Sequence, residues 1–171
     1  MLQKDFYENK YPILANFIRK HRTLNIAFKM IYYGIPVIMI MFYIVFLIKV
    51  YRDYGKKSLK NALVIPAIAF IGISLFRKFY NKKRPYEKYN YRPIIVRKKK
   101  GSSMPSRHTF SAAVIAAAVS VYYPILAPFM WLMTGVVAFS RFLAGVHYAW
   151  DIIVAILLAI GVRISMGLVK S

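Results

Sequence analysis

The 171-residue sequence contains no cysteine, which excludes disulfide bonds, thiolate metal sites and cysteine nucleophiles. Acidic residues are also scarce, because five Asp and Glu stand against 26 Lys and Arg, and the formal net charge is +21. Histidine occurs three times. A metal cage built from several carboxylates or imidazoles therefore has few ligands to draw on, and we expect neither a metal nor another cofactor.

Hydrophobic residues are abundant, at 59% of the chain, which is more than a water-soluble domain of this size normally carries. Five apolar runs approach the ~20 residues that a spanning helix needs. They cover residues 31–48, 62–76, 108–126, 129–146 and 152–169. We therefore predict an all-α fold: a multi-pass transmembrane helical bundle of about five spanning helices, forming a single domain over residues 1–171 in the cell membrane.

Residues 1–30 precede the first apolar run. Within them, residues 11–29 mix apolar with basic side chains, which is typical of an interfacial amphipathic helix that lies on the membrane surface. A solvated terminus without regular structure is the alternative. The excess of Lys and Arg suits the headgroups of anionic lipids, since spanning proteins gather basic residues there. We thus expect anionic lipids as partners and no nucleic acid.

One long polar connection, from Arg77 to Arg107, carries twelve Lys and Arg residues. A connection of this length in a small bundle is usually functional or disordered. With five spans, this loop, the N-terminus and the connection between the last two spans all fall on one face of the membrane. Residues 77–108 are therefore predicted to lie beside residues 141–151.

Two of the three histidines, His108 and His147, stand at span ends on this shared face, whereas His21 lies in a basic stretch and is expected at the surface. Asp151 follows His147 by four positions and is the only acidic residue after Glu87. Residues four apart on a helix share a face, so the carboxylate can accept a proton from one imidazole nitrogen and leave the other as a nucleophile. A purely structural hydrogen bond is the alternative for this pair alone.

Several groups suited to an anion share the same face. Ser106 is placed to cap the helix of the third run, so that its first amides and the positive end of its dipole face an anion. Arg84 and Arg141 supply guanidiniums, which bind phosphate oxygens in pairs. Anchoring at the membrane interface is the alternative for four basic residues near the end of the second run: Arg77, Lys78, Lys82 and Lys83.

Three blocks of these residues resemble the signature of the type 2 phosphatidic acid phosphatase family, which includes the vanadium haloperoxidases. The third family motif is Ser-Arg, five residues, His, three residues, Asp, and it is matched at every fixed position. The matching residues are Ser140, Arg141, His147 and Asp151. The resemblance covers roughly residues 60–165, the expected catalytic core.

The first two motifs match with departures. The first is a Lys, six residues and Arg-Pro; here Arg84 and Pro85 fit, but Arg77 takes the place of the Lys and Lys78 is one position too near. The second is Pro-Ser-Gly-His, and Arg107 stands where the family usually has Gly. We expect either Arg77 or Lys78 to supply the first charge, and Arg107 to act as an extra donor suited to a diphosphate.

The resemblance implies a metal-independent phosphatase mechanism through a phosphohistidine. His147, oriented by Asp151, attacks phosphorus, and His108 protonates the leaving oxygen and then activates water. The implied phosphate-binding residues are Arg77, Lys78, Arg84, Ser106, Arg107 and Arg141. A site at the membrane favours a lipid phosphate as substrate. Undecaprenyl diphosphate, phosphatidylglycerol phosphate and phosphatidate all remain compatible.

Two other functions are compatible with part of the sequence. A vanadate-dependent haloperoxidase would share the oxyanion pocket, although a spanning bundle suits chemistry on a soluble halide poorly. A non-catalytic basic membrane protein that binds anionic lipids would explain the charge but not the three motifs.

Overall fold

A computed structural model describes residues 2–97 and 100–170, and within these ranges the regular structure is helical, without strands. The elements in chain order are α1 (Leu2–Asp5), a π-helical turn (Phe6–Lys10), α2 (Tyr11–Lys20), α3 (Arg22–Tyr80), α4 (Pro85–Lys88), α5 (Arg107–Tyr122), a 3-10 turn (Pro124–Leu126), α6 (Ala127–Leu143) and α7 (Ala149–Lys170). The predicted all-α bundle is confirmed.

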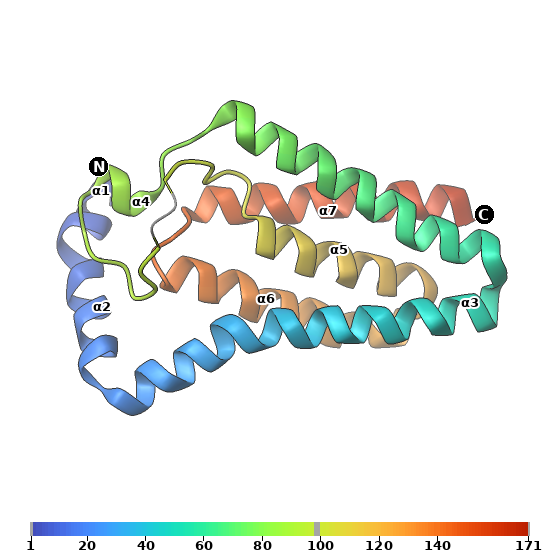
Figure 1. Ribbon diagram of the computed structural model, residues 1–171, viewed down its shortest axis with the longest axis horizontal. Helices are drawn as coiled ribbons and strands as arrows, with labels where there is room; N and C mark the ends of the chain where they lie inside the picture. Colours follow the sequence, from blue (N-terminus) through green and yellow to red (C-terminus); the bar gives the residue numbers. More distant parts are fainter. Residues whose placement is uncertain (1, 98–99, 171) are drawn as a thin grey trace.

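The 59-residue α3 is a helical hairpin. Gly55 has φ 78° and ψ −177°, a conformation that is open to glycine but strained for a residue with a Cβ. The chain reverses there, so the two halves of α3 run in opposite directions along the bundle (Figure 1). These halves contain the first two apolar runs of the sequence.

Within the described residues, three helical stretches are long and apolar enough to cross a membrane: Arg22–Lys88, which contains α3; Pro124–Leu143, which contains α6; and α7. The folded α3 passes along the bundle twice, and α5, at 16 residues, lies between the longer helices (Figure 1). The five predicted runs thus correspond to five packed helical segments. The count of five membrane crossings stays a prediction.

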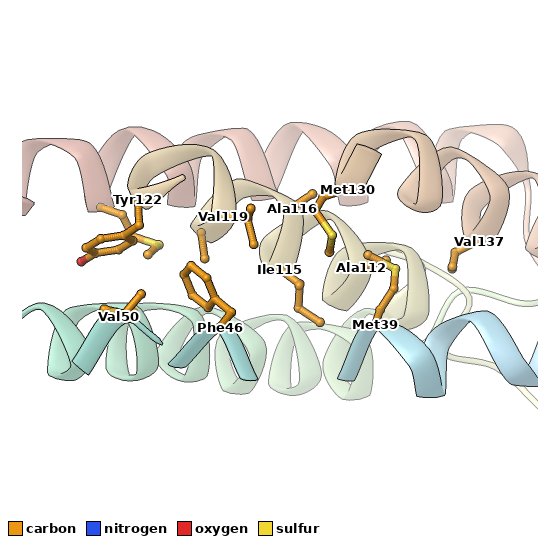
Figure 2. Close-up of a cluster of buried hydrophobic side chains, with 13 residues drawn as sticks. Met39, Phe46, Val50, Ala112, Ile115, Ala116, Val119, Tyr122, Met130 and Val137 are labelled. Atoms are coloured by element: carbon orange, nitrogen blue, oxygen red, sulfur yellow. The ribbon is translucent and has the colours of Figure 1, made fainter. Parts of the chain in front are cut away.

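The centre of the bundle is α5, whose small side chains let other helices approach closely. Ala113, Ala116, Ala117 and Ala118 are inaccessible to solvent. Figure 2 shows Met39 and Phe46 of the first half of α3 directed toward this helix. The outer faces of the long helices instead expose Ile, Leu, Val and Phe side chains, as expected where lipid is the solvent.

The N-terminal segment is helical and crosses one end of the bundle (Figure 1). One face of α2 is buried, through Tyr11, Ala15 and Ile18, while Ile13 and Phe17 on the other side are exposed. The predicted extent of this helix is wrong, because His21 has extended backbone angles and α3 begins at Arg22. Residues 22–29 therefore continue into the first long helix instead of lying flat with α2.

Three segments that are distant in sequence meet at this end of the bundle. They are the N-terminal helices, the loop from Asn81 to Ser106 and the connection between α6 and α7 (Figure 1). The predicted proximity of residues 77–108 to residues 141–151 is confirmed by the backbone bond from Ser106 N–H to the Asp151 carbonyl, at 2.8 Å.

Candidate active site

Asp151, in the first turn of α7, organises the polar cluster at this end. Its side chain is fully buried. Lys82 donates to Oδ1 at 2.8 Å, the Tyr148 N–H donates to Oδ2 at 3.1 Å, and the Ser103 hydroxyl also donates to Oδ2. Each of these bonds stabilises the ionised carboxylate.

His147 lies two residues before α7, so the pair with Asp151 does not share a helix face as the spacing suggested. The contact forms because the Asp151 carboxylate turns back toward the connection: His147 Nδ1 is 3.5 Å from Oδ2. Nδ1 makes no hydrogen bond within the described structure. Catalytic hydrogen bonds are often long in unliganded sites and tighten when substrate binds.

The protonation state of His147 suits a nucleophile. Burial lowers the pKa of its imidazole to about 4, and the Asp151 carboxylate offsets only part of this effect. The ring is therefore neutral at neutral pH and keeps a lone pair. Because Nδ1 faces Asp151, Nε2 is the ring nitrogen that is not directed at the carboxylate.

His108 lies in the first turn of α5 and is partly buried. Its imidazole interacts electrostatically with Arg141, Arg97 and His147. The two imidazoles therefore belong to one cluster, although one lies on α5 and the other in the connection before α7. Ser106, immediately before α5, is fully buried, and its hydroxyl accepts a bond from Thr109 Oγ1 at 3.0 Å instead of capping the helix.

Arg141, near the end of α6, has the least satisfied side chain of the cluster. It is 1% exposed. Nη2 donates to the Tyr32 carbonyl at 2.7 Å, and the guanidinium carbon lies 3.6 Å from the centre of the Tyr32 ring. Nε and Nη1 are buried without a hydrogen-bond partner among the described residues, which is costly unless a ligand supplies one.

Arg84 and Arg77 are buried beside the same cluster and bond to loop carbonyls. Arg84 donates to Gly101 and Val146. Arg77 donates to three carbonyls in the loop before α5, those of Ser102, Ser103 and Pro105. These two guanidiniums hold the loop against the site.

Two predicted phosphate-binding residues have exposed side chains, although one of them, Arg107, still interacts electrostatically with Arg77 and His108. Lys78 is exposed, whereas its neighbour Arg77 is 6% exposed, so Arg77 is the basic residue of the first motif that faces inward. Arg107 is also exposed, and its guanidinium carbon lies 5.9 Å from the centre of the Phe70 ring on the second half of α3. The structure brings together the other predicted residues: His108, His147, Asp151, Arg77, Arg84, Ser106 and Arg141.

Tyrosine hydroxyls hold the connection that carries His147. Tyr7 donates to the His147 carbonyl at 3.4 Å, and Tyr11 donates to the Leu143 carbonyl at 3.2 Å. Tyr91 donates to the Gly145 carbonyl at 2.7 Å. Two of these three residues come from the N-terminal segment, which therefore positions the connection.

Gly145 provides a test of this packing. Its φ is +73°, and a Cβ built there would lie 2.3 Å from the Tyr11 hydroxyl. The space beside Gly145 is therefore filled by the Tyr11 side chain. We expect Gly145→Ala to lower the free energy of unfolding by about 2–4 kcal/mol, from backbone strain and overpacking, as measured by thermal unfolding in detergent.

Gly135→Ala is the matched control, because a Cβ at this position in α6 meets nothing within 4 Å. An alanine in a helix interior should be neutral or slightly stabilising. Equal melting temperatures for Gly145→Ala and the wild-type protein would contradict the packing described for Tyr11.

Sequence reasoning missed Lys82 and Ser103 as partners of Asp151, and Tyr7, Tyr11 and Tyr91 as supports of the His147 connection. Lys82 stands among other basic residues of the loop, and no local pattern marks it. The tyrosines act across more than 50 positions of sequence, so no short motif could contain both partners.

The cluster has an excess of positive charge. Arg77, Arg84 and Arg141 are each less than a tenth exposed, and none forms an ion pair with a carboxylate within the described ranges. Burying unpaired charges is costly, so an anionic ligand would stabilise this arrangement. In the described part of the chain, no three His, Asp or Glu side chains gather as a metal site would need.

Comparison with known proteins adds a family and a fold. The sequence profile of the PAP2 superfamily matches residues 58–168. A search of curated proteins gave no match.

Two solved structures share the fold. LpxE from Aquifex aeolicus superposes with a TM-score of 0.64 at 20% identity, covering 91% of each chain. The first transmembrane PAP2 type phosphatidylglycerolphosphate phosphatase from Bacillus subtilis gives 0.62 at 16% identity, covering 97% of this chain and 94% of the other.

Proposed function

The chain belongs to the PAP2 superfamily, and on this premise we propose that it is a membrane phosphatase that removes phosphate from a lipid. The observation that carries the proposal is the buried group of guanidiniums without ion pairs, with two unpartnered nitrogens on Arg141, beside a neutral imidazole at His147. Phosphoryl transfer requires hydrogen-bond donors that can bind the phosphate oxygens beside a nucleophile.

The proposed reaction has two steps. Nε2 of His147 attacks phosphorus, the bond to the lipid oxygen breaks, and His108 gives that oxygen its proton. Water then attacks the phosphohistidine as His108 takes a proton from it, the P–N bond breaks, and inorganic phosphate leaves. Asp151 stabilises the imidazolium character that develops on His147, while Arg141 and the first amides of α5 bind the phosphate oxygens.

An apolar groove supports a lipid as the substrate. A cavity of about 310 Å³ lies between the second half of α3 and α5, lined by side chains such as Leu63, Phe70, Phe110 and Val114. Ser111 also lines it, and its hydroxyl donates to the Arg107 carbonyl at 3.0 Å. The groove therefore begins one helical turn from His108, so a hydrocarbon chain bound there would bring its phosphate to the imidazoles.

The substrate class we propose is a lipid phosphomonoester or diphosphate, namely undecaprenyl diphosphate, phosphatidylglycerol phosphate or phosphatidate. The test is phosphate release from each of these by the purified protein in EDTA. We expect release from at least one lipid without added metal. The described site has guanidiniums that can bind an anion, and in it no three His, Asp or Glu side chains cluster as metal ligands would. No release from any of them, with or without Mg²⁺, would contradict the proposed function.

A further inference from the structure

Tyr32 lies in the first half of α3, before the residues that the family profile matches. Its side chain is fully buried, and its hydroxyl makes no hydrogen bond within the described structure. Among the described residues, the other buried side-chain atoms without a partner are Asn25 Oδ1, Nε and Nη1 of Arg141, and Nδ1 of His147. A buried hydroxyl without a partner is rare in folded proteins and calls for a ligand or water.

The Tyr32 hydroxyl is close to the cations of the site. The Tyr32 side chain is within electrostatic range of the Arg84 guanidinium, and it approaches the Arg141 guanidinium to the edge of hydrogen-bonding range without meeting the distance and angle of a hydrogen bond. The ring of Tyr32 contacts Arg141 at 3.6 Å and also lies near Arg97, whose guanidinium carbon is 5.6 Å from the ring centre. The backbone carbonyl accepts the bond from Arg141 Nη2. Tyr32 thus holds one cation of the phosphate site and lies close to two more.

We propose that Tyr32 is a substrate-binding residue, whose hydroxyl donates a hydrogen bond to the phosphate group that His147 attacks. Its ring and carbonyl fix Arg141 so that the two unpartnered nitrogens bind the same group. A neutral donor is useful at this place, because the site already holds several mutually repelling guanidiniums. The inference rests on the proposed function and adds a residue from outside the three motifs.

The test separates the hydroxyl from the ring. Tyr32→Phe keeps the ring and the backbone carbonyl but removes the donor, so we expect the Kd for inorganic phosphate, measured by calorimetry, to rise about tenfold. KM for the lipid should rise with it while kcat changes little. Tyr32→Leu also removes the ring beneath Arg141, so kcat should fall as well.

Tyr51→Phe is the matched control, because Tyr51 lies in the same half of α3 and is 55% exposed. It should bind phosphate and turn over lipid like the wild-type protein. The melting temperature distinguishes this role from a structural one, because the loss of a structural hydrogen bond would lower it. Without phosphate, Tyr32→Phe should be as stable as the wild type or more so, because it loses an unsatisfied buried hydroxyl; with phosphate, it should gain less stability.

Each outcome decides the question. Wild-type phosphate affinity in Tyr32→Phe, or a lower melting temperature without ligand, would overturn the role of Tyr32 even if the protein is a lipid phosphatase. In another outcome, the wild-type protein binds phosphate more tightly than Tyr32→Phe and yet hydrolyses none of the lipids tested. This result would support the inference and contradict the proposed activity. Failure of the wild-type protein to bind phosphate would overturn both.

Discussion

Replacing His147 by alanine should abolish phosphate release, with kcat falling at least about 10⁴-fold, as expected when a covalent nucleophile is removed. The fold should survive, because the buried His147 ring makes no hydrogen bond through Nδ1. Release of phosphate from the preferred lipid, followed over time, measures the effect. His21→Ala is the control, since His21 is exposed at the junction of α2 and α3.

The intermediate gives this prediction a second readout. Rapid quenching with a labelled substrate should trap phosphate on the wild-type protein in an acid-labile, base-stable form, and none on His147→Ala. His108→Ala should accumulate the label when the leaving group is p-nitrophenolate, because such a group departs without protonation whereas water still needs a base. A His147→Ala protein that retains labelled phosphate would place the nucleophile elsewhere.

The second large effect is expected from Asp151→Asn, with a loss of about 10³–10⁴-fold in kcat, by analogy with the carboxylate of a Ser-His-Asp triad. The substitution keeps the size of the side chain but removes the charge that faces His147 and pairs with Lys82. Because this carboxylate raises the pKa of His147 against the effect of burial, its loss should move that pKa below the wild-type value of about 4.

An NMR titration of labelled histidine can follow this shift, since the chain has only three histidines. Lys82→Met serves as the comparison: it removes the other half of the ion pair but leaves the carboxylate facing His147, so we expect a loss of only about tenfold. Equal losses in the two variants would mean that the ion pair, and not the orientation of the imidazole, is what Asp151 contributes.

The parts of the fold that could be predicted are those set by local composition. Each apolar run became a helical segment, because length and hydropathy decide whether a segment forms a helix in lipid. The boundary between α2 and α3 could not be predicted, since the basic and apolar residues on both sides of His21 have the same character.

The site was predictable where its residues lie in short motifs. His108, Arg84, Arg141 and the pair of His147 and Asp151 lie at one end of the bundle, as the order of the spans implied. The inward position of Arg77 and the outward position of Lys78 and Arg107 depend on the rotation of each helix about its axis. One residue of offset turns a side chain by about 100°, and a motif does not specify that rotation.

The bonds from Tyr7 and Tyr11 to the connection between α6 and α7 have a consequence for engineering. A shortened protein that begins near the second half of α3 would keep every motif but would lose both hydroxyls, so that, of the side-chain bonds described, only those from Tyr91 and Arg84 would still hold the backbone before His147. A displacement of 1 Å can cost a catalyst a hundredfold. Grafting the three motifs into another helical scaffold would therefore also require side chains that take the place of Tyr7 and Tyr11 and bond to the connection that carries His147.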